Sequence, residues 1–216
     1  MKKLCLFDLD GTLIDPYIAI TSGIQYALGD QGILVEDLDK LTGFIGPPIR
    51  DSFRNFCPDF TNEQIERLVS KYLEHFSIKG LHENKLYPGI LDMLKQLKEE
   101  GLILTIATSK LMVNAKKIAR LLEFESYFDL IIGCEANGTR SIKSDIIEYL
   151  LKEIDPKRQY SPVMIGDRKY DIIGANAQGI ESIGVTWGYG SREELENEKP
   201  GHIVDSIDEL TRILLA

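Results

Sequence analysis

The segment Asp8-Leu9-Asp10-Gly11-Thr12-Leu13 places two carboxylates two positions apart and follows them with a glycine. Such a pair suits phosphoryl transfer, because one carboxylate can attack phosphorus and the other can protonate the leaving oxygen and later activate water. Gly11 permits the sharp turn that brings both side chains toward one point. The alternative interpretation is an ordinary strand-to-turn junction, where aspartate and glycine are common for conformational reasons alone.

A second acidic segment, Gly166-Asp167-Arg168-Lys169-Tyr170-Asp171, separates its carboxylates by four positions. Mg²⁺ prefers one or two carboxylates together with water and substrate phosphate, so these side chains are candidate ligands. A cation is needed because an anionic nucleophile must approach an anionic phosphate. The alternative is structural: an N-cap aspartate and a first-turn aspartate that complement the helix dipole.

Two further groups suit a bound phosphate. Thr108-Ser109-Lys110 follows an apolar run, and hydroxyls and amides at a helix start bind phosphate readily, although a simple Ser/Thr N-cap has the same pattern. Lys143 precedes another helical pattern, where its charge can balance the nucleophile and the phosphate. Most lysines, however, are merely solvated.

Short apolar runs come before these candidates and predict the strands that position them. Their richness in Ile, Leu and Val is typical of strands buried on both faces. The runs are residues 3–7, 102–107, 130–132, 162–165 and 182–186. Ligands of parallel sheets bind beyond the carboxyl ends of the strands, which is where the candidate residues lie.

Helical patterns alternate with the later strands. One has Pro88 at its expected first position and Gly101 at its expected C-terminal cap. Others cover 111–122 and 144–154, the latter with Ser144 as candidate N-cap. This alternation predicts a parallel sheet with helices on both faces.

Residues 15 to about 86 break the alternation and read as helices only. Ile20, Ile24 and Leu28 form one apolar stripe, and Thr61-Asn62-Glu63-Gln64 has the pattern of a capping box that opens a further helix. The loop Gly43–Pro48 interrupts the region. We therefore expect an all-helical insertion after the first strand.

Composition limits the partners and the location. Hydrophobic residues make up 44% and charged residues 27% of 216 residues, and the net charge is −9. An acidic surface repels nucleic-acid polymers and anionic membranes, but a small phosphorylated metabolite remains a suitable partner. Cys5, Cys57 and Cys134 suggest neither a disulfide framework nor a zinc site. This cysteine usage fits a reducing cytoplasm, so we expect a cytoplasmic protein. No run approaches the ~20 apolar residues of a membrane span.

Taken together, the four groups resemble the haloacid dehalogenase (HAD) superfamily, whose motifs match in order as 8–12, Thr108, Lys143 and 166–171. The resemblance spans nearly the whole chain, since the helical insertion sits where that family places its cap. It implies an α/β fold: a three-layer, Rossmann-like parallel-sheet core of residues 1–14 and 87–216, with a helical C1-type cap of residues 15–86.

The resemblance also implies residue roles. Asp8 is the expected nucleophile and Mg²⁺ ligand, and Asp10 the general acid/base, with its backbone carbonyl also on the metal. Thr108 and the Ser109 amide are expected to hold the phosphoryl oxygens, and Lys143 to neutralise Asp8 and the phosphate.

Asp167 is implied as a second metal ligand, while Asp171 either joins the metal shell or orients Lys143. Many relatives have Lys-Pro where this chain has Lys143-Ser144, so Arg140 is the rival cation. Arg50 follows the 43–48 loop and either meets a substrate anion or is a surface residue of the cap.

A closer resemblance is to the phosphoglycolate-phosphatase-like branch, on residues 43–48, 166–168 and 187–195. Within 187–195, Trp187 and Tyr189 are expected to pack rather than bind. The implied function is Mg²⁺-dependent hydrolysis of small phosphomonoesters through an aspartyl-phosphate, by a monomer or homodimer.

The alternatives in that family are a 5'-nucleotidase, an inorganic pyrophosphatase or a β-phosphoglucomutase-like mutase, and a non-catalytic regulatory protein is the alternative of another class. A dehalogenase or phosphonatase is disfavoured, because those relatives do not keep the second aspartate, present here as Asp10.

Overall fold

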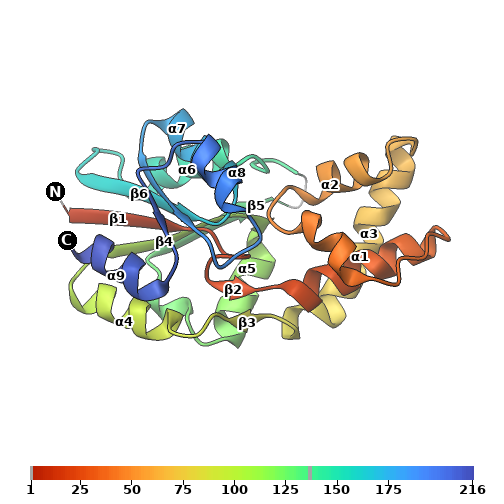
Figure 1. Ribbon diagram of the computed structural model, residues 1–216, viewed down its shortest axis with the longest axis horizontal. Coiled ribbons are helices and arrows are strands. Elements are labelled where there is room, and N and C mark those ends of the chain that lie inside the picture. Colours follow the sequence, from red (N-terminus) through yellow and green to blue (C-terminus); the bar gives the residue numbers. More distant parts are fainter. Residues whose placement is uncertain (1, 136–137) are drawn as a thin grey trace. The chain divides into compact units, whose positions relative to one another are not determined.

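The computed structural model describes residues 2–135 and 138–216, and its elements are labelled in Figure 1. Contacts divide the chain into two compact units. The first, which we call the core unit, comprises Met1–Asp15 and Leu86–Ala216, and the second, the helical unit, comprises Pro16–Lys85. The core unit carries the sheet.

A six-stranded sheet with the strand order β5-β4-β1-β6-β7-β8 forms the middle of the core unit. Its strands are β1 (Lys2–Phe7), β4 (Ile103–Leu111), β5 (Leu130–Cys134), β6 (Tyr160–Gly166), β7 (Glu181–Val185) and β8 (His202–Val204). All neighbouring strands pair in parallel. The predicted parallel α/β fold is therefore confirmed.

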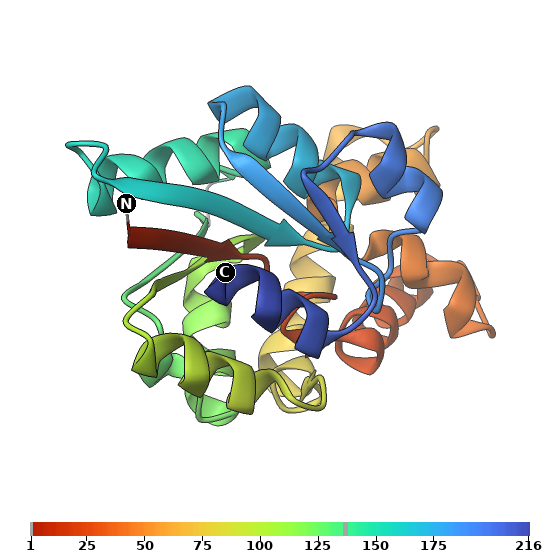
Figure 2. The same cartoon turned by 60° about the vertical axis from the view of Figure 1, so that its left-hand side comes forward.

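Helices cover both faces of this sheet, which makes three layers (Figures 1 and 2). One face carries α4 (Ile90–Glu99), α5 (Met112–Leu121) and α9 (Ile207–Leu215), and the other carries α6 (Lys143–Ile154), α7 (Lys169–Gln178) and α8 (Arg192–Asn197). The 3-10 turn η3 (Glu125–Tyr127) lies between α5 and β5. Because the helices cover the two faces of the sheet, the carboxyl ends of the strands are the edge at which a site can form.

The strand β1 is the central element of the core. It pairs with β4 on one side and β6 on the other, so that Phe7 lies opposite both Ile106 and Ile165. Its residues Leu4, Cys5, Leu6 and Phe7 have no exposed surface. Burial of this kind stabilises a fold by about 25 cal/mol per Å² of apolar surface, and it fixes the position from which Asp8 emerges.

Two local predictions were wrong, and one short strand of the main sheet was missed. The helix α4 begins at Ile90 rather than Pro88, because Gly89 takes a left-handed conformation with φ of 92°. The N-cap of α6 is Ile142 rather than Ser144, whose hydroxyl instead donates to Asp145. The short strand β8 was not predicted, since three residues of which only Val204 is buried give no apolar run.

The strand β4 is also longer than its apolar run, and it contains the whole of Thr108-Ser109-Lys110. The helix α5 begins only at Met112. The predicted helix-start position of this triplet is therefore wrong, and these residues present their groups from the end of a strand.

The helical unit contains α1 (Tyr17–Asp30), η1 (Leu38–Phe44), α2 (Ile49–Phe56), α3 (Asn62–Ile78) and η2 (Gly80–His82). Its core includes Ile24, Leu28, Phe53 and Phe76, all at most 1% exposed. The capping box is confirmed, because Thr61 accepts from the Gln64 amide and the Gln64 side chain accepts from the Thr61 amide. Two short strands, β2 (Ile14–Asp15) and β3 (Lys85–Leu86), pair with each other.

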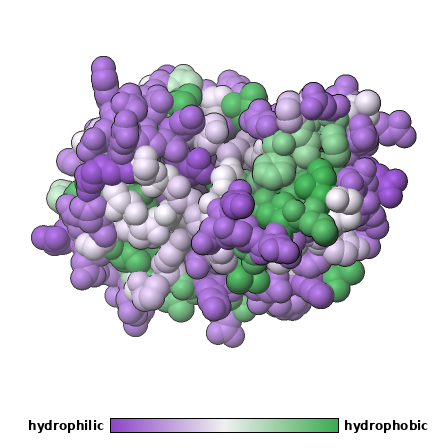
Figure 3. All heavy atoms as spheres, turned by 45° about the vertical axis from the view of Figure 1, so that its right-hand side comes forward, coloured by the Kyte–Doolittle hydropathy of each residue, from purple (hydrophilic) through white to green (hydrophobic). Residues whose placement is uncertain are grey.

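The face of the molecule shown in Figure 3 is mostly hydrophilic, with one large hydrophobic area and several smaller ones. Apolar atoms supply much of the surface of any folded protein, so these areas do not by themselves indicate a binding site. Among the described residues, none of the helices combines the length and apolar character needed to cross a bilayer.

Candidate active site

Asp8 and Asp10 occupy a tight turn directly after β1, and both are almost buried, at 3% and 8% exposure. The amides of Leu13 and Ile14 donate to the Leu9 carbonyl, which closes the turn. Gly11 has φ of 82°, and a Cβ at that position would lie 2.3 Å from Oδ2 of Asp167. Only glycine therefore allows the turn to approach the second acidic segment so closely.

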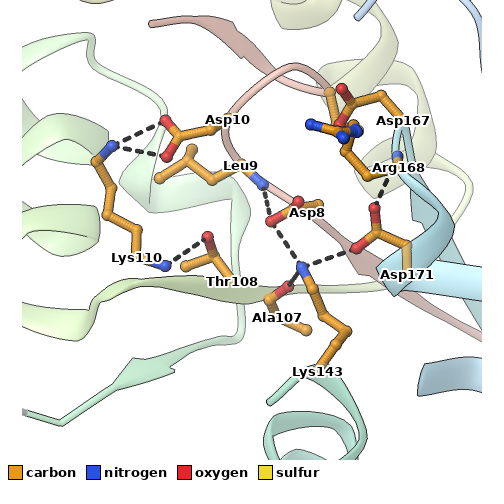
Figure 4. A network of polar contacts seen from close by, with 11 residues as sticks. Asp8, Leu9, Asp10, Ala107, Thr108, Lys110, Lys143, Asp167, Arg168 and Asp171 are labelled. Carbon is orange, nitrogen blue, oxygen red and sulfur yellow. Dashed lines mark hydrogen bonds and ion pairs between the residues drawn. The ribbon is translucent and has the colours of Figure 1, made fainter. Parts of the chain in front are cut away.

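Lys143, from the first turn of α6, lies between two of the aspartates (Figure 4). Its Nζ is 2.9 Å from Oδ1 of Asp8, 2.8 Å from Oδ1 of Asp171 and 2.9 Å from the Ala107 carbonyl oxygen. These contacts use all three ammonium donors. Burial disfavours the charged form, but the two carboxylates outweigh it and raise the pKa of Lys143 above its ordinary value.

Arg140, the rival cation, is bound elsewhere. It forms an ion pair with Glu135, and its guanidinium lies 4.0 Å from the ring centroid of Tyr149. The cation that the structure brings to Asp8 is Lys143.

Asp167 follows β6 and is fully buried. Its Oδ1 accepts from the Thr12 hydroxyl at 3.2 Å and its Oδ2 from the Tyr189 amide at 2.8 Å. Burial, followed by the charges of Asp171 and Asp8, raises the pKa of Asp167 to about 8. The Thr12 hydroxyl and the Tyr189 amide are both uncharged, so their hydrogen bonds offset only a small part of the cost of burying the ionised carboxylate.

Asp171 lies in the first turn of α7, and its Oδ2 accepts from the Arg168 amide at 3.1 Å. Burial raises its pKa above the ordinary range, and Lys143 opposes that shift. Of the two roles expected for Asp171, its contact with Lys143 is visible in the structure, and its distance from the other carboxylates also permits the metal role.

The carboxylates of Asp8, Asp167 and Asp171 fit a divalent cation. Each offers one oxygen, and these oxygens lie within 4.8 Å of one another. The three carboxylates have a single ammonium, that of Lys143, in ion-pair contact among the described residues. One Mg²⁺ would balance the two remaining charges, and hard carboxylate oxygens are the ligands that Mg²⁺ prefers.

Thr108 is 1% exposed, and its hydroxyl accepts from the Lys110 amide at 3.2 Å. Ser109 follows it and is partly exposed. Both residues belong to β4, beside Ala107, whose carbonyl contacts Lys143. A hydroxyl and an amide at this edge are suitable donors to phosphoryl oxygens.

Lys110 was named from the sequence only as part of the triplet 108–110 and was given no role of its own. Its Nζ is 2.9 Å and 2.7 Å from the two carboxylate oxygens of Asp10. Burial raises the pKa of Asp10, while the charge of Lys110 opposes the rise. The triplet was interpreted as a helix start, and the direction of the Lys110 side chain depends on an irregularity in the pairing of β4 with β5.

The segment Trp187-Gly188-Tyr189-Gly190 encloses Asp167, which the sequence also did not indicate. Besides the Tyr189 amide, the Trp187 indole donates to the Thr12 carbonyl at 3.1 Å. A Cβ on Gly190 would lie 1.9 Å from the Asp167 carbonyl oxygen. The aromatic residues were expected to pack. The Tyr189 amide in fact reaches the Asp167 carboxylate, and the Trp187 indole reaches the backbone of the turn that follows β1.

Arg50 belongs to the helical unit, where it lies on α2 and forms an ion pair with Glu66 at 2.7 Å. Its side chain is 32% exposed, so an anion can approach the guanidinium. The predicted contact of Arg50 with substrate remains a prediction.

Comparisons with known proteins agree with this geometry. A 5'-nucleotidase from Pseudomonas aeruginosa is 40% identical over 97% of this chain and 94% of its own. A phosphoglycolate phosphatase from Agrobacterium fabrum is 28% identical over 99% and 93%. The crystal structure of a predicted phosphatase from Clostridium acetobutylicum matches with a TM-score of 0.95 and 42% identity, over 100% of this chain and 99% of that one.

Residues 5–185 match the haloacid dehalogenase-like hydrolase family. That range begins in β1, includes Asp8, Thr108, Lys143 and Asp167, and ends with β7. The chain therefore belongs to the haloacid dehalogenase-like hydrolases.

Proposed function

We propose that the protein is a Mg²⁺-dependent phosphatase that hydrolyses small phosphomonoesters through an aspartyl-phosphate on Asp8. The observation that carries this proposal is the position of the Asp8 carboxylate. It is 2.9 Å from the buried ammonium of Lys143 and within 4.8 Å of oxygens of Asp167 and Asp171. A carboxylate held in this way has its charge balanced and its orientation fixed before a phosphate arrives.

In the first transfer, an oxygen of Asp8 attacks phosphorus, and the bond from phosphorus to the leaving oxygen breaks. The Leu9 amide and Lys143 both donate to Oδ1, so we assign the attack to Oδ2. Protonated Asp10 gives its proton to the leaving oxygen, which departs as an alcohol. Thr108 and the Ser109 amide hold the phosphoryl oxygens, and the charge of Lys143 neutralises Asp8 and the phosphate.

In the second transfer, Asp10 takes a proton from water, which attacks the same phosphorus and releases phosphate from Asp8. Asp10 thereby regains the proton that it gave up. When bound to Asp8, Asp167 and the Asp10 carbonyl, Mg²⁺ supplies positive charge that lets the anionic nucleophile approach the anionic phosphate.

The substrate class is proposed from the relatives. Phosphoglycolate follows from the branch resemblance and from the Agrobacterium fabrum relative. A nucleoside 5'-monophosphate is the second candidate, favoured by the 40% identical relative that is named a 5'-nucleotidase. The helical unit is the proposed cap, with Arg50 as its proposed contact with a substrate anion.

A phosphate-release screen tests the proposal. Phosphoglycolate, nucleoside 5'-monophosphates, sugar phosphates and pyrophosphate are each assayed with Mg²⁺ and with EDTA. We expect release that needs Mg²⁺, and Asp8→Asn should reduce kcat by more than about 10³-fold, since losing the nucleophile is more severe than losing acid–base action. Wild-type turnover by Asp8→Asn would exclude Asp8 as the nucleophile, and dependence on a sugar bisphosphate would indicate a mutase.

A further inference from the structure

The ion pair of Lys110 with Asp10 is almost completely buried, with 5% of the lysine side chain and 11% of the aspartate side chain exposed. The ammonium contacts both carboxylate oxygens, at 2.9 Å and 2.7 Å. A buried pair of this kind is held strongly, because separating it would leave two charges without compensation. The pair therefore fixes the orientation of the Asp10 carboxylate (Figure 4).

An irregularity in β4 places Lys110 in this position. Thr108 lies opposite Gly133 of β5, but Leu111 lies opposite the very next residue, Cys134, so Ser109 and Lys110 form a bulge. Bulges re-aim side chains next to active sites. A Cβ on Gly133 would lie 2.5 Å from the Lys110 carbonyl oxygen, so glycine at that position lets the bulged chain pass.

The two candidate catalytic carboxylates thus have separate lysines. Asp8 contacts Lys143 of α6, and Asp10 contacts Lys110 of β4. The nucleophile keeps its own partner when Lys110 is replaced, so a defect caused by losing Lys110 should be confined to the steps in which Asp10 takes part.

We propose that Lys110 is a positioning residue that orients the Asp10 carboxylate for proton transfer to the leaving oxygen; this inference rests on the proposed phosphatase function. One Asp10 oxygen accepts from the Lys110 ammonium, while the other carries the proton to the departing oxygen. The bond from phosphorus to that oxygen breaks as the new O–H bond forms, and the resulting carboxylate is again bound by Lys110.

The leaving group distinguishes this role from a general structural one. An alkoxide needs a proton to depart, whereas p-nitrophenolate is stable as an anion and departs without one. Lys110→Met should therefore lower kcat/KM for an alkyl phosphate about 10- to 100-fold, less than the roughly 10²–10⁴-fold contribution of acid–base catalysis itself, because Asp10 is misoriented but still present. It should change kcat/KM for p-nitrophenyl phosphate by less than about threefold, since kcat/KM reports the first transfer.

A double-mutant cycle tests whether Lys110 acts through Asp10. Once Asp10→Asn has removed the proton donor, adding Lys110→Met should produce no further loss on the alkyl phosphate. Lys110→Arg retains the charge and should restore part of the alkyl phosphatase activity. Lys117→Met, an exposed substitution on α5, is the matched control and should behave as wild type with both substrates.

Equal losses on the two substrates, or a full additional loss in the Asp10→Asn background, would overturn the role of Lys110. If Lys110→Met does not fold, as judged by circular dichroism, Lys110→Arg decides the question. Its guanidinium would be displaced from the ammonium position, so kcat/KM should again fall selectively for the alkyl phosphate, but by a smaller factor. A wild-type protein that hydrolyses neither substrate would instead contradict the proposed function. If the wild type is active, Asp8→Asn is inactive and Lys110→Met lowers kcat/KM equally for both substrates, the proposed function stands and only the role of Lys110 is contradicted.

Discussion

Lys143 links Asp8 to Asp171, with its Nζ 2.9 Å from one carboxylate and 2.8 Å from the other. The first turn of α6 and the first turn of α7 are thereby joined to the end of β1 by one buried ammonium. Its replacement affects both the fold and the reaction, because two buried carboxylates are paired with its charge.

Replacing Lys143 by methionine should lower the free energy of unfolding by about 3–5 kcal/mol, the usual effect of breaking a buried ion pair from one side. It should also lower kcat by at least about 10²-fold, since the phosphate and Asp8 lose their neutralising cation. Denaturant unfolding and phosphate release are the measurements. Lys152→Met, on the exposed side of the same helix, is the control, and equal effects of the two substitutions would contradict the prediction.

The metal-free protein should become less stable as pH rises toward 8. The pKa of Asp167 is about 8 in the folded state and about 3.9 in an unfolded chain, so the folded state binds the additional proton between these values. Stability falls with rising pH wherever the folded state binds more protons. The melting temperature in EDTA should thus be higher at about pH 6 than at about pH 8.5.

Two further measurements isolate Asp167 as the source of that dependence. In Asp167→Asn, the difference in melting temperature between the two pH values should be smaller than in the wild type. Mg²⁺ should stabilise the wild type more at the higher pH, because the metal binds the ionised carboxylates. An unchanged difference in Asp167→Asn would assign the pH dependence to other groups.

Gly11→Ala and Gly32→Ala separate backbone strain from displacement of a ligand. Both glycines have positive φ, at 82° and 75°, but a Cβ on Gly11 meets Asp167 whereas one on Gly32 meets nothing within 4 Å. Each should lose about 1–2 kcal/mol of stability through strain. Only Gly11→Ala should also weaken Mg²⁺ binding, by about 10- to 100-fold, as measured by calorimetry. Equal Mg²⁺ affinity in the two variants would exclude the displacement.

Arg50→Ala tests the proposed substrate contact of the helical unit. Arg50 and Arg54 both lie on α2 and both form an ion pair, with Glu66 and Asp51 respectively. If Arg50 binds a substrate anion, its loss should raise KM about tenfold, as expected for a hydrogen bond to a charged group, while Arg54→Ala leaves KM unchanged. Steady-state kinetics on an anionic phosphoester give the KM of both variants. Equal KM values for Arg50→Ala and Arg54→Ala would show that Arg50 does not bind the substrate.

The sequence predicts the parts of the site that depend on strand ends. The apolar run 3–7 ends directly before Asp8, and the run 162–165 ends one residue short of Asp167. These runs determine both the strands and the positions of the two carboxylates, because parallel strands end at one edge of the sheet. Lys110 could not be placed in the same way, since its direction depends on a bulge in the pairing with Gly133. The Tyr189 contact was also not predictable, because it is made by a backbone amide that every residue except proline possesses.

The position of β1 has a consequence for how activity is lost. This strand is hydrogen-bonded on both sides and its residues Leu4–Phe7 are inaccessible to solvent, so its amides should exchange with water only when the entire core unit opens. Asp8 is attached to the end of that strand. Fluctuations that fray peripheral helices leave the nucleophile anchored, and the reactive carboxylate is released only together with the rest of the fold.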